Sequence, residues 1–195
     1  MAFLRALSRE ERWRESRESP SSVQYGASSV LPVEPGGLAC LQAHRYRSEV
    51  MRFISDGVPW PDDRIQEFVE RQIICLRESG YCLWRLLEPE TGQMIGFCGL
   101  QPLAGTPDIE IGWWLARSHW GCGLATEAAR VVLRDGFARV GLDRIVAVAQ
   151  PANSASRRVM QKLGMRYERD TRHKGIDVVL YAIHPSPGTR GGLSA

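Results

Sequence analysis

The chain has 195 residues with a formal net charge of +3, 44% hydrophobic residues and 24% charged residues. These values are typical of a globular protein with one domain or one domain plus tails, and the small, dispersed positive charge gives no support for a nucleic-acid partner. Five cysteines without a CxxC spacing, and no apolar run near the roughly 18–20 residues of a membrane span, predict a cytoplasmic protein without a disulfide framework or a membrane partner.

The two ends of the chain differ in composition from its middle. Residues 1–22 are mixed in charge and end in Ser and Pro, which predicts a flexible N-terminal arm. Residues 186–195 are small and polar and are expected to be a disordered tail, which leaves residues 23–185 as one domain. Near the start of this domain, residues 21–33 offer a divergent first strand and residues 34–46 a first helix.

The first strongly patterned segment, residues 62–80, has an apolar helical face and ends at a glycine, Gly80. Asp63 and Gln66 have the spacing of a capping box at its start. The residues expected to face the core are Ile65, Phe68, Val69, Ile73 and Leu76. The pattern predicts an amphipathic helix.

Strands and helices alternate in the rest of the chain. Residues 81–103 predict a hairpin around a Glu-Pro-Glu-Thr-Gly turn, and residues 108–116 predict a strand with Glu110, Gly112 and Trp114 on one face. The later predicted elements are a helix over about 124–140, a buried strand over 143–150, a short helix over 153–164 capped by Asn153, and a strand pair over 165–172 and 177–184. Hairpins at both ends of this alternation predict an α/β (α+β) fold, in which helices pack on a mixed sheet.

The stretch "SHWGCGLATEAARVVL", Ser118–Leu133, places Gly121 and Gly123 between a predicted strand and a predicted helix. A tight turn is the simplest interpretation of such a pair. The context also predicts an anion cradle, because the first N–H groups of a helix lack partners and glycines let a ligand approach them. A P-loop is excluded because Leu124 follows the last glycine where a lysine is needed. A dinucleotide site is a weaker alternative, because Thr126 stands where the third glycine of that fingerprint belongs.

The stretch "EIGWWLARSHWGCGLATEA", followed downstream by "NSASRRVMQKLGM", resembles the GNAT superfamily of acetyl-CoA-dependent N-acetyltransferases, most closely its RimJ/RimL-like branch. The resemblance covers roughly residues 48–184. It implies a mostly antiparallel sheet that is splayed between the fourth and fifth strands of the family, with helices on both faces. It also implies acetyl-CoA as co-substrate and an amine acceptor, either a peptide or protein N-terminus or a small molecule. The protein is expected to be a monomer or a homodimer.

The resemblance assigns the glycine pair to the pyrophosphate of acetyl-CoA. Backbone near Trp114 and Leu115 would pair with the pantetheine arm and offer an oxyanion donor, and Asn153 and Ser156 match the family's Asn-x-x-Ser beside the pantetheine and the sulfur. The complete set implied to bind the cofactor is Trp114, Leu115, Trp120, Gly121, Cys122, Gly123, Leu124, Ala125, Thr126, Asn153 and Ser156. Trp120 and Cys122 replace polar or basic residues of the family pattern, so backbone amides are expected to hold the pyrophosphate almost alone.

The resemblance also implies catalytic roles for Glu110 and Ser156. Glu110 would act as the base, directly or through water, and Ser156 could protonate the leaving thiolate, because Met160 occupies the position of the tyrosine that serves in many relatives. A Glu110 that is only salt-bridged or solvent-facing, and a Ser156 that only touches the cofactor, are the open alternatives.

Other features leave further interpretations open. Cys122 lies at a helix N-terminus, where the pKa of a thiol falls, but the sequence offers no clear Cys-His-Asp set for a covalent mechanism. Trp60, Trp84 and Trp114 are candidates for the acceptor side of the site, with a core position as the default. The histidines lack metal-ligand spacing, so no metal is expected. A non-catalytic acetyl-CoA-binding module is the alternative to an enzyme.

Overall fold

The computed structural model describes residues 23–25, 28–31, 51–54, 57–58, 60–88 and 90–186, with side chains from residue 51 onward. The expected arm over residues 1–22, the expected helix over residues 34–46 and the expected tail beyond residue 186 lie outside the described residues. Within residues 21–33, where one strand was expected, the structure has two, β1 (Val23–Tyr25) and β2 (Ser28–Leu31).

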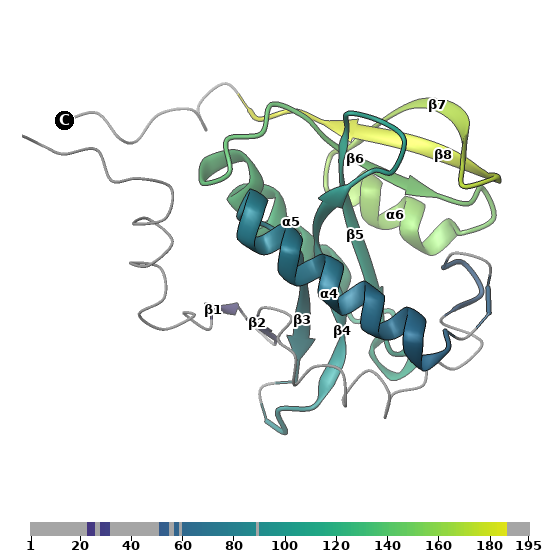
Figure 1. Cartoon of the computed structure of the whole chain (residues 1–195). Helices are drawn as coiled ribbons and strands as arrows, with labels where there is room; N and C mark the ends of the chain where they lie inside the picture. The colour runs from purple at the N-terminus through teal and green to yellow at the C-terminus, as the bar shows by residue number, and fades with distance from the viewer. Residues whose placement is uncertain are drawn as a thin grey trace, which may run out of the picture.

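One sheet contains the strands of the described residues, in the order β1-β2-β3-β4-β5-β6-β8-β7 (Figure 1). The remaining strands are β3 (Leu83–Leu87), β4 (Met94–Pro102), β5 (Ile109–Leu115), β6 (Ile145–Ala149), β7 (Arg166–His173) and β8 (Ile176–Ile183). Neighbouring strands in this part of the chain are antiparallel, except for the parallel pair β5 and β6. The prediction of a mixed, mostly antiparallel sheet is confirmed.

The helices of the described residues are α4 (Asp62–Ser79), α5 (Leu124–Ala138) and α6 (Ser154–Lys162), with a short 3-10 turn, η1 (Arg117–His119), before α5. The expected glycine stop of α4 is confirmed, because Gly80 adopts the left-handed conformation with φ 76°. The expected capping box is wrong. The helix starts at Asp62 after Pro61, so Asp63 lies inside the first turn, and the side chain of Gln66 donates to Glu70.

The helices cover both faces of the sheet, as predicted. On one face, α4 crosses the strands (Figure 1) and buries Phe68 and Val69 against Leu83 and Phe97. On the other face, α5 and α6 contribute to a larger core with side chains of β3 to β6 and β8. Gly136 allows α5 to lie close to the sheet, because a Cβ at this position would be 2.9 Å from the side chain of Ile145.

The sheet is splayed between β5 and β6, which are the fourth and fifth strands of the family pattern. The two strands pair at one position, Glu110 with Val146, whereas β5 pairs with β4 along its whole length. The amide of Ala116 donates to Ile95 of β4 at 2.7 Å. Because successive residues of a strand direct their backbone groups to opposite sides, the N–H groups of Trp113 and Leu115 point away from β4 toward the slot.

The closed end of this slot is held by an ion-pair cluster. Arg144, directly before β6, donates from Nε to Asp108, directly before β5, at 3.1 Å. Its two Nη atoms bond the two carboxylate oxygens of Glu168 on β7. One guanidinium therefore ties the two halves of the sheet together where β5 and β6 begin.

Candidate functional site

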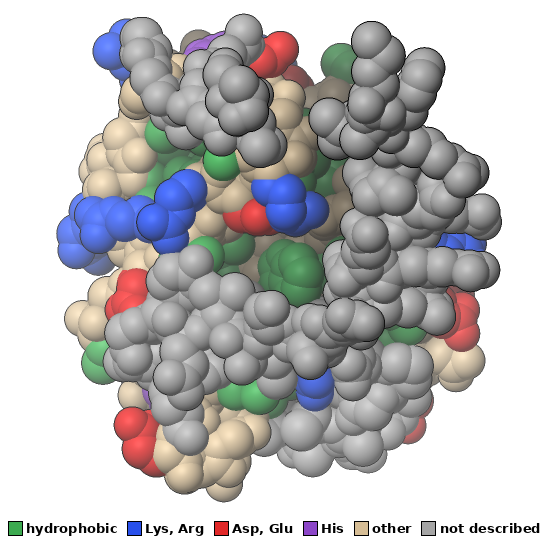
Figure 2. All heavy atoms as spheres, turned by 90° about the vertical axis from the view of Figure 1, so that its left-hand side faces the viewer, with side chains coloured by type: hydrophobic (Ala, Val, Ile, Leu, Met, Phe, Trp, Pro, Cys, Tyr) green, Lys and Arg blue, Asp and Glu red, His purple; other side chains and the backbone are tan. Residues whose placement is uncertain are grey.

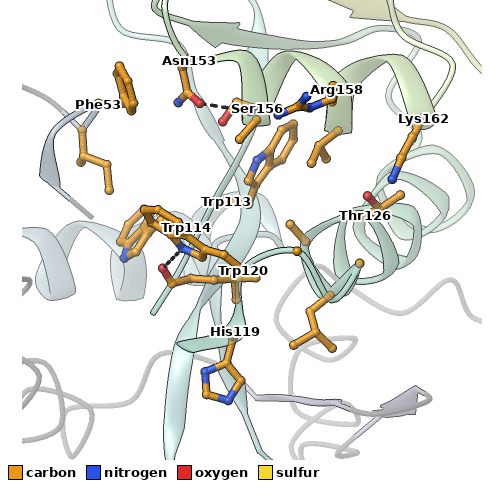
Figure 3. A pocket seen from close by; sticks show the side chains of 18 residues that line it. Phe53, Trp113, Trp114, His119, Trp120, Thr126, Asn153, Ser156, Arg158 and Lys162 are labelled. Atoms are coloured by element: carbon orange, nitrogen blue, oxygen red, sulfur yellow. Dashed lines mark hydrogen bonds between the residues drawn. The ribbon is translucent and has the colours of Figure 1, made fainter. Parts of the chain in front are cut away.

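A cavity of about 370 Å³ lies where the slot between β5 and β6 meets the N-termini of α5 and α6 (Figure 3). The predicted cofactor-binding residues that line it are Trp114, Leu115, Trp120, Gly121, Gly123, Leu124, Ala125, Thr126, Asn153 and Ser156. Cys122 of the predicted set does not line the cavity, and neither does Glu110. The structure thus brings two sequence segments, around residues 114–126 and 153–156, into one concave site.

The N-terminus of α5 presents backbone donors to this cavity. Gly123 is the N-cap, with φ 85° and no side chain that could cap the helix, and Gly121 has φ 77°. The N–H groups of Thr126 and Glu127 donate to the carbonyl of Gly123 at 3.0 and 3.1 Å. Within the described residues, the N–H groups of Leu124 and Ala125 have no protein acceptor. These free donors and the positive end of the helix dipole give this end of the cavity the properties that suit an anion.

The N-terminus of α6 is arranged differently. The side chain of Asn153 accepts the N–H of Ser156 at 3.1 Å, which is the N-cap that the sequence predicts. Ser156 is partly buried and lines the cavity (Figure 3), whereas Met160 is buried at 1% exposure. The first turn of α6 therefore satisfies one of its own donors and offers a hydroxyl group to the site.

Side-chain contacts fix the loop between β5 and α5. The indole of Trp120 donates to the carbonyl of Leu115 at 2.8 Å, which ties the loop to the end of β5. His119 lies 3.3 Å from Glu88 and 2.9 Å from the hydroxyl of Ser118. Hydrogen bonds from Thr91 and from His119 lower the pKa of the partly exposed Glu88 carboxyl.

The covalent alternative at Cys122 gains no support from these contacts. Its thiol donates to the carbonyl of Trp120 at 3.5 Å, and in the described part of the chain it has no contact with His119. The side chain of Cys122 is exposed and does not line the cavity.

Sequence reasoning missed two basic side chains of the cavity, Arg158 and Lys162. Both lie on α6, and Lys162 points toward Thr126 on α5 (Figure 3). This end of the cavity therefore has basic side chains beside the backbone amides of α5, which the expectation from Trp120 and Cys122 did not include. The signal was present in the sequence, because positions 158 and 162 repeat at helical spacing within the predicted helix.

Glu110 lies at the closed end of the slot, on the face of β5 that also carries Trp114. Its carboxylate accepts a hydrogen bond from Gln101 at 2.7 Å. Burial raises the pKa of Glu110, and the bond from Gln101 and the charge of Lys174 partly offset that rise. A partly buried carboxyl with a raised pKa has properties that suit a general base, although Glu110 itself does not line the cavity.

A family model described as Acetyltransferase (GNAT) domain matches residues 32–166. The chain belongs to the GNAT family of acetyltransferases. Among its relatives, the protein described as "Uncharacterized protein YkkB" from Bacillus subtilis (strain 168) is 38% identical over 108 residues, covering 53% of this chain and 63% of that protein. The protein described as "Uncharacterized N-acetyltransferase YnaD" from the same organism is 34% identical over 121 residues, covering 62% of this chain and 68% of that protein. The alignment to YkkB thus spans less than two thirds of its length.

Solved structures extend this relationship at the level of the fold. Mycobacterium smegmatis RimJ in complex with CoA-disulfide superposes with a TM-score of 0.67 at 23% identity, covering 80% of this chain and 81% of that chain. RimL and RimJ proteins are thus among the structural neighbours of this GNAT member, and the resemblance given by the two sequence motifs is confirmed.

The described part of the GNAT chain contains no cluster of His, Cys, Asp and Glu residues able to hold a metal ion. None of the described helices is both long and apolar enough to cross a membrane. On the face of the molecule at the left of Figure 1, basic, acidic and hydrophobic side chains are interspersed among the coloured atoms (Figure 2). No uniform charge of one sign is visible among them.

Proposed function

We propose that this protein transfers the acetyl group of acetyl-CoA to a primary amine, of a peptide or protein N-terminus or of a small molecule, by direct attack in a ternary complex. The observation that carries the proposal is the cavity in which the uncapped N-terminus of α5 meets the unpaired edge of β5. One part of the cavity binds anions and the other presents strand-like donors. An acetyl-CoA molecule needs both.

The residues of the cavity fit acetyl-CoA. The free amides of Leu124 and Ala125, with Arg158 and Lys162 across from them, suit a pyrophosphate. The outward N–H groups of Trp113 and Leu115 suit the amides of a pantetheine arm, which would continue the sheet on the open edge of β5.

The residues of this chain would then act as follows. Acetyl-CoA supplies an acetyl group activated as a thioester. The backbone amides at the end of β5 donate hydrogen bonds to the thioester oxygen, where negative charge develops, an interaction typically worth about 3 kcal/mol per donor. The carboxylate of Glu110 takes the proton of the amine, directly or through water, because an ammonium group has no lone pair with which to attack. The hydroxyl of Ser156 can protonate the departing sulfur.

A kinetic experiment tests the proposal. The purified protein is incubated with acetyl-CoA and a panel of amines, and release of free CoA is followed. Turnover with at least one amine is expected, and Glu110→Gln should lower kcat about 100-fold or more, since general-base catalysis contributes roughly 10²–10⁴-fold. Glu70→Gln, which neutralises an exposed carboxylate on α4, is the matched control and should keep wild-type activity.

One observation favours a second function, a non-catalytic acetyl-CoA-binding module. The tyrosine that serves as acid in many relatives is replaced by Met160, whose side chain is buried at 1% exposure and cannot donate a proton. Micromolar binding of acetyl-CoA without turnover of any amine would support this module over the enzyme.

A further inference from the structure

The cavity has two chemically different ends. Arg158, Lys162 and Thr126 lie at one end, while Phe53 and Trp114 lie at the other (Figure 3). The cationic end suits the phosphates of the co-substrate. The aromatic end, which lies on the α4 side of the sheet, is left for the acceptor.

At the aromatic end, other aromatic rings pack behind Trp114, which forms a wall of the cavity. The ring of Trp114 lies 4.8 Å from that of Phe97 and 5.8 Å from that of Phe68, measured between centroids. Phe68 also contacts Trp60 at 5.4 Å, so Trp60 forms part of the backing of the wall. These contacts hold the indole of Trp114 in place and present its remaining surface to the cavity.

The other tryptophan considered for the acceptor side, Trp84, does not contribute. It pairs with Cys98 of β4, and Cys98 belongs to the core on the α5 face of the sheet. Phe53, which sequence reasoning did not single out, takes part in the site instead. The guanidinium of Arg52 lies 5.2 Å from the centroid of the Phe53 ring and covers one side of it.

The charges around the cavity disfavour a polycationic acceptor. None of the described residues that line it is Asp or Glu, whereas Arg158 and Lys162 are cationic, and Arg52 lies beside the aromatic end. Several ammonium groups would meet no carboxylate partners there. A single amine is treated differently, because nearby positive charge lowers the pKa of its ammonium form and favours the neutral, reactive form.

On these grounds we propose that the acceptor is a primary amine that carries an aromatic or large apolar group, which packs against Phe53 and Trp114. On β5, the face that carries Trp114 continues through Gly112, which has no side chain, to Glu110. An amine attached to a ring at the aromatic wall would point along this face of β5, past the side chain of Leu83 near Gly112, toward the carboxylate. The inference rests on the proposed acetyl transfer and adds the class of acceptor.

Two matched pairs of acceptors test this inference. The first pair is ethylamine and 2-phenylethylamine, and the second is the peptides Gly-Gly-Gly and Phe-Gly-Gly, so that a free amine and a peptide N-terminus are compared separately. We expect kcat/KM to be higher for the aromatic member of at least one pair, on the order of 10- to 100-fold, which is the effect of burying one large apolar group. Spermidine should react less efficiently than the preferred aromatic amine.

The variant Phe53→Ala provides the structural test. It should lower the preference for the aromatic member of the pair about tenfold, and because the readout is a ratio of two kcat/KM values, a loss of folded protein cancels. Phe137→Ala, which removes a partly buried ring from α5 on the opposite face of the sheet, is the control and should leave the ratio unchanged. A KM for acetyl-CoA that stays within about twofold in Phe53→Ala would place the effect on the acceptor side.

The outcomes separate this inference from the proposed function. If ethylamine or spermidine reacts as efficiently as the aromatic amines, or if Phe53→Ala leaves the ratio unchanged, the acceptor class is wrong while acetyl transfer stands. If no amine of the panel is acetylated although acetyl-CoA binds, the proposed function fails and this inference fails with it.

Discussion

Replacing Gly123 with valine is expected to weaken acetyl-CoA binding through the backbone alone. The residue has φ 85°, and no heavy atom lies within 4 Å of an added Cβ, so the substitution causes no clash. An L-residue in this left-handed conformation costs about 1–2 kcal/mol, and a β-branched residue costs more. A chain that avoids this cost by changing φ turns the first amides of α5 away from the cavity.

The expected loss can be worked out from those amides. A hydrogen bond to a charged group contributes about 1.5–3 kcal/mol, and each 1.4 kcal/mol corresponds to a factor of ten. Loss of one such bond, from Leu124 or Ala125 to a phosphate, should therefore raise the Kd for acetyl-CoA roughly 10- to 150-fold. Isothermal titration calorimetry with acetyl-CoA measures this change directly.

Gly105→Val is the matched control for strain. Gly105 lies in the turn between β4 and β5 with φ 80° and also has no heavy atom within 4 Å of an added Cβ. Both variants should lose similar stability, with a decrease in Tm of roughly 2–8 °C, but only Gly123→Val should lose affinity. Cys122→Ser should bind normally. A wild-type Kd for Gly123→Val, or lost binding in Cys122→Ser, would refute this account of the loop.

Three further predictions concern charged side chains. Because burial raises the pKa of Glu110, kcat/KM should fall as the pH drops through that raised pKa. The free energy of unfolding should instead fall as the pH rises through the same pKa. The reason is that the folded state then loses a proton that the unfolded chain has already lost. Glu110→Gln should therefore not lower Tm at pH 8, and a clear decrease in differential scanning calorimetry would indicate a structural role instead. Lys162→Gln should raise the Kd for acetyl-CoA about three- to tenfold at low salt and less at high salt, as an ion pair with phosphate requires. Arg130→Gln on α5 is the control and should not raise this Kd. Equal effects of the two variants would argue against phosphate binding at the cationic end of the cavity. Arg144→Met should cost about 1–2 kcal/mol in urea unfolding, because it breaks a bidentate, partly buried pair, whereas Arg172→Met, from a pair exposed at 72% and 81%, should cost less than about 0.5 kcal/mol.

The elements that the sequence predicted correctly depend on local signals. The helix α4 ends at Gly80, whose left-handed conformation is a property of that residue, and β5 shows the alternation of a strand covered differently on its two faces. The capping box failed because the expected N-cap, Asp63, lies two residues after the observed one, Pro61, and the helix takes the earlier start. Sequence patterns alone do not fix the first residue of a helix to better than one or two positions.

The site was predicted less completely than the fold because it depends on tertiary contacts. The glycine pair before α5 is a signal within one segment, and it predicted an anion site. Both glycines line the cavity. Arg158 and Lys162 face that site only because α6 packs beside α5, and Phe53 reaches the cavity from a segment that has no periodic pattern. No spacing within one segment could have connected these residues. The roles of Glu110 and Ser156 remain predictions.

The two helix N-termini at the cavity show how one residue decides whether such an end can bind a ligand. At α6, Asn153 supplies a side-chain oxygen that accepts the N–H of Ser156. At α5, Gly123 supplies none, so the equivalent donors stay available although both helices begin beside the same slot. A capping side chain at α5 would stabilise that helix by about 1 kcal/mol and would occupy an amide that a phosphate needs. Gly123 therefore leaves α5 without a side-chain cap and keeps these amides available for the proposed phosphate contact.

The register of β5 connects this binding site to the acceptor side. Backbone N–H groups of Trp113 and Leu115 face the slot, while side chains of Glu110 and Trp114 face α4. A slip of the strand by one residue would turn these N–H groups away from the slot and these side chains to the other face of the sheet. The register is held at Gly96 of β4, where an added Cβ would overlap the carbonyl oxygen of Trp114. Only a residue without a side chain allows this approach, and the close contact fixes which residues of β5 point in each direction. The positions of Glu110, the proposed base, and of the proposed oxyanion donors therefore have a common origin in the packing of β4 against β5.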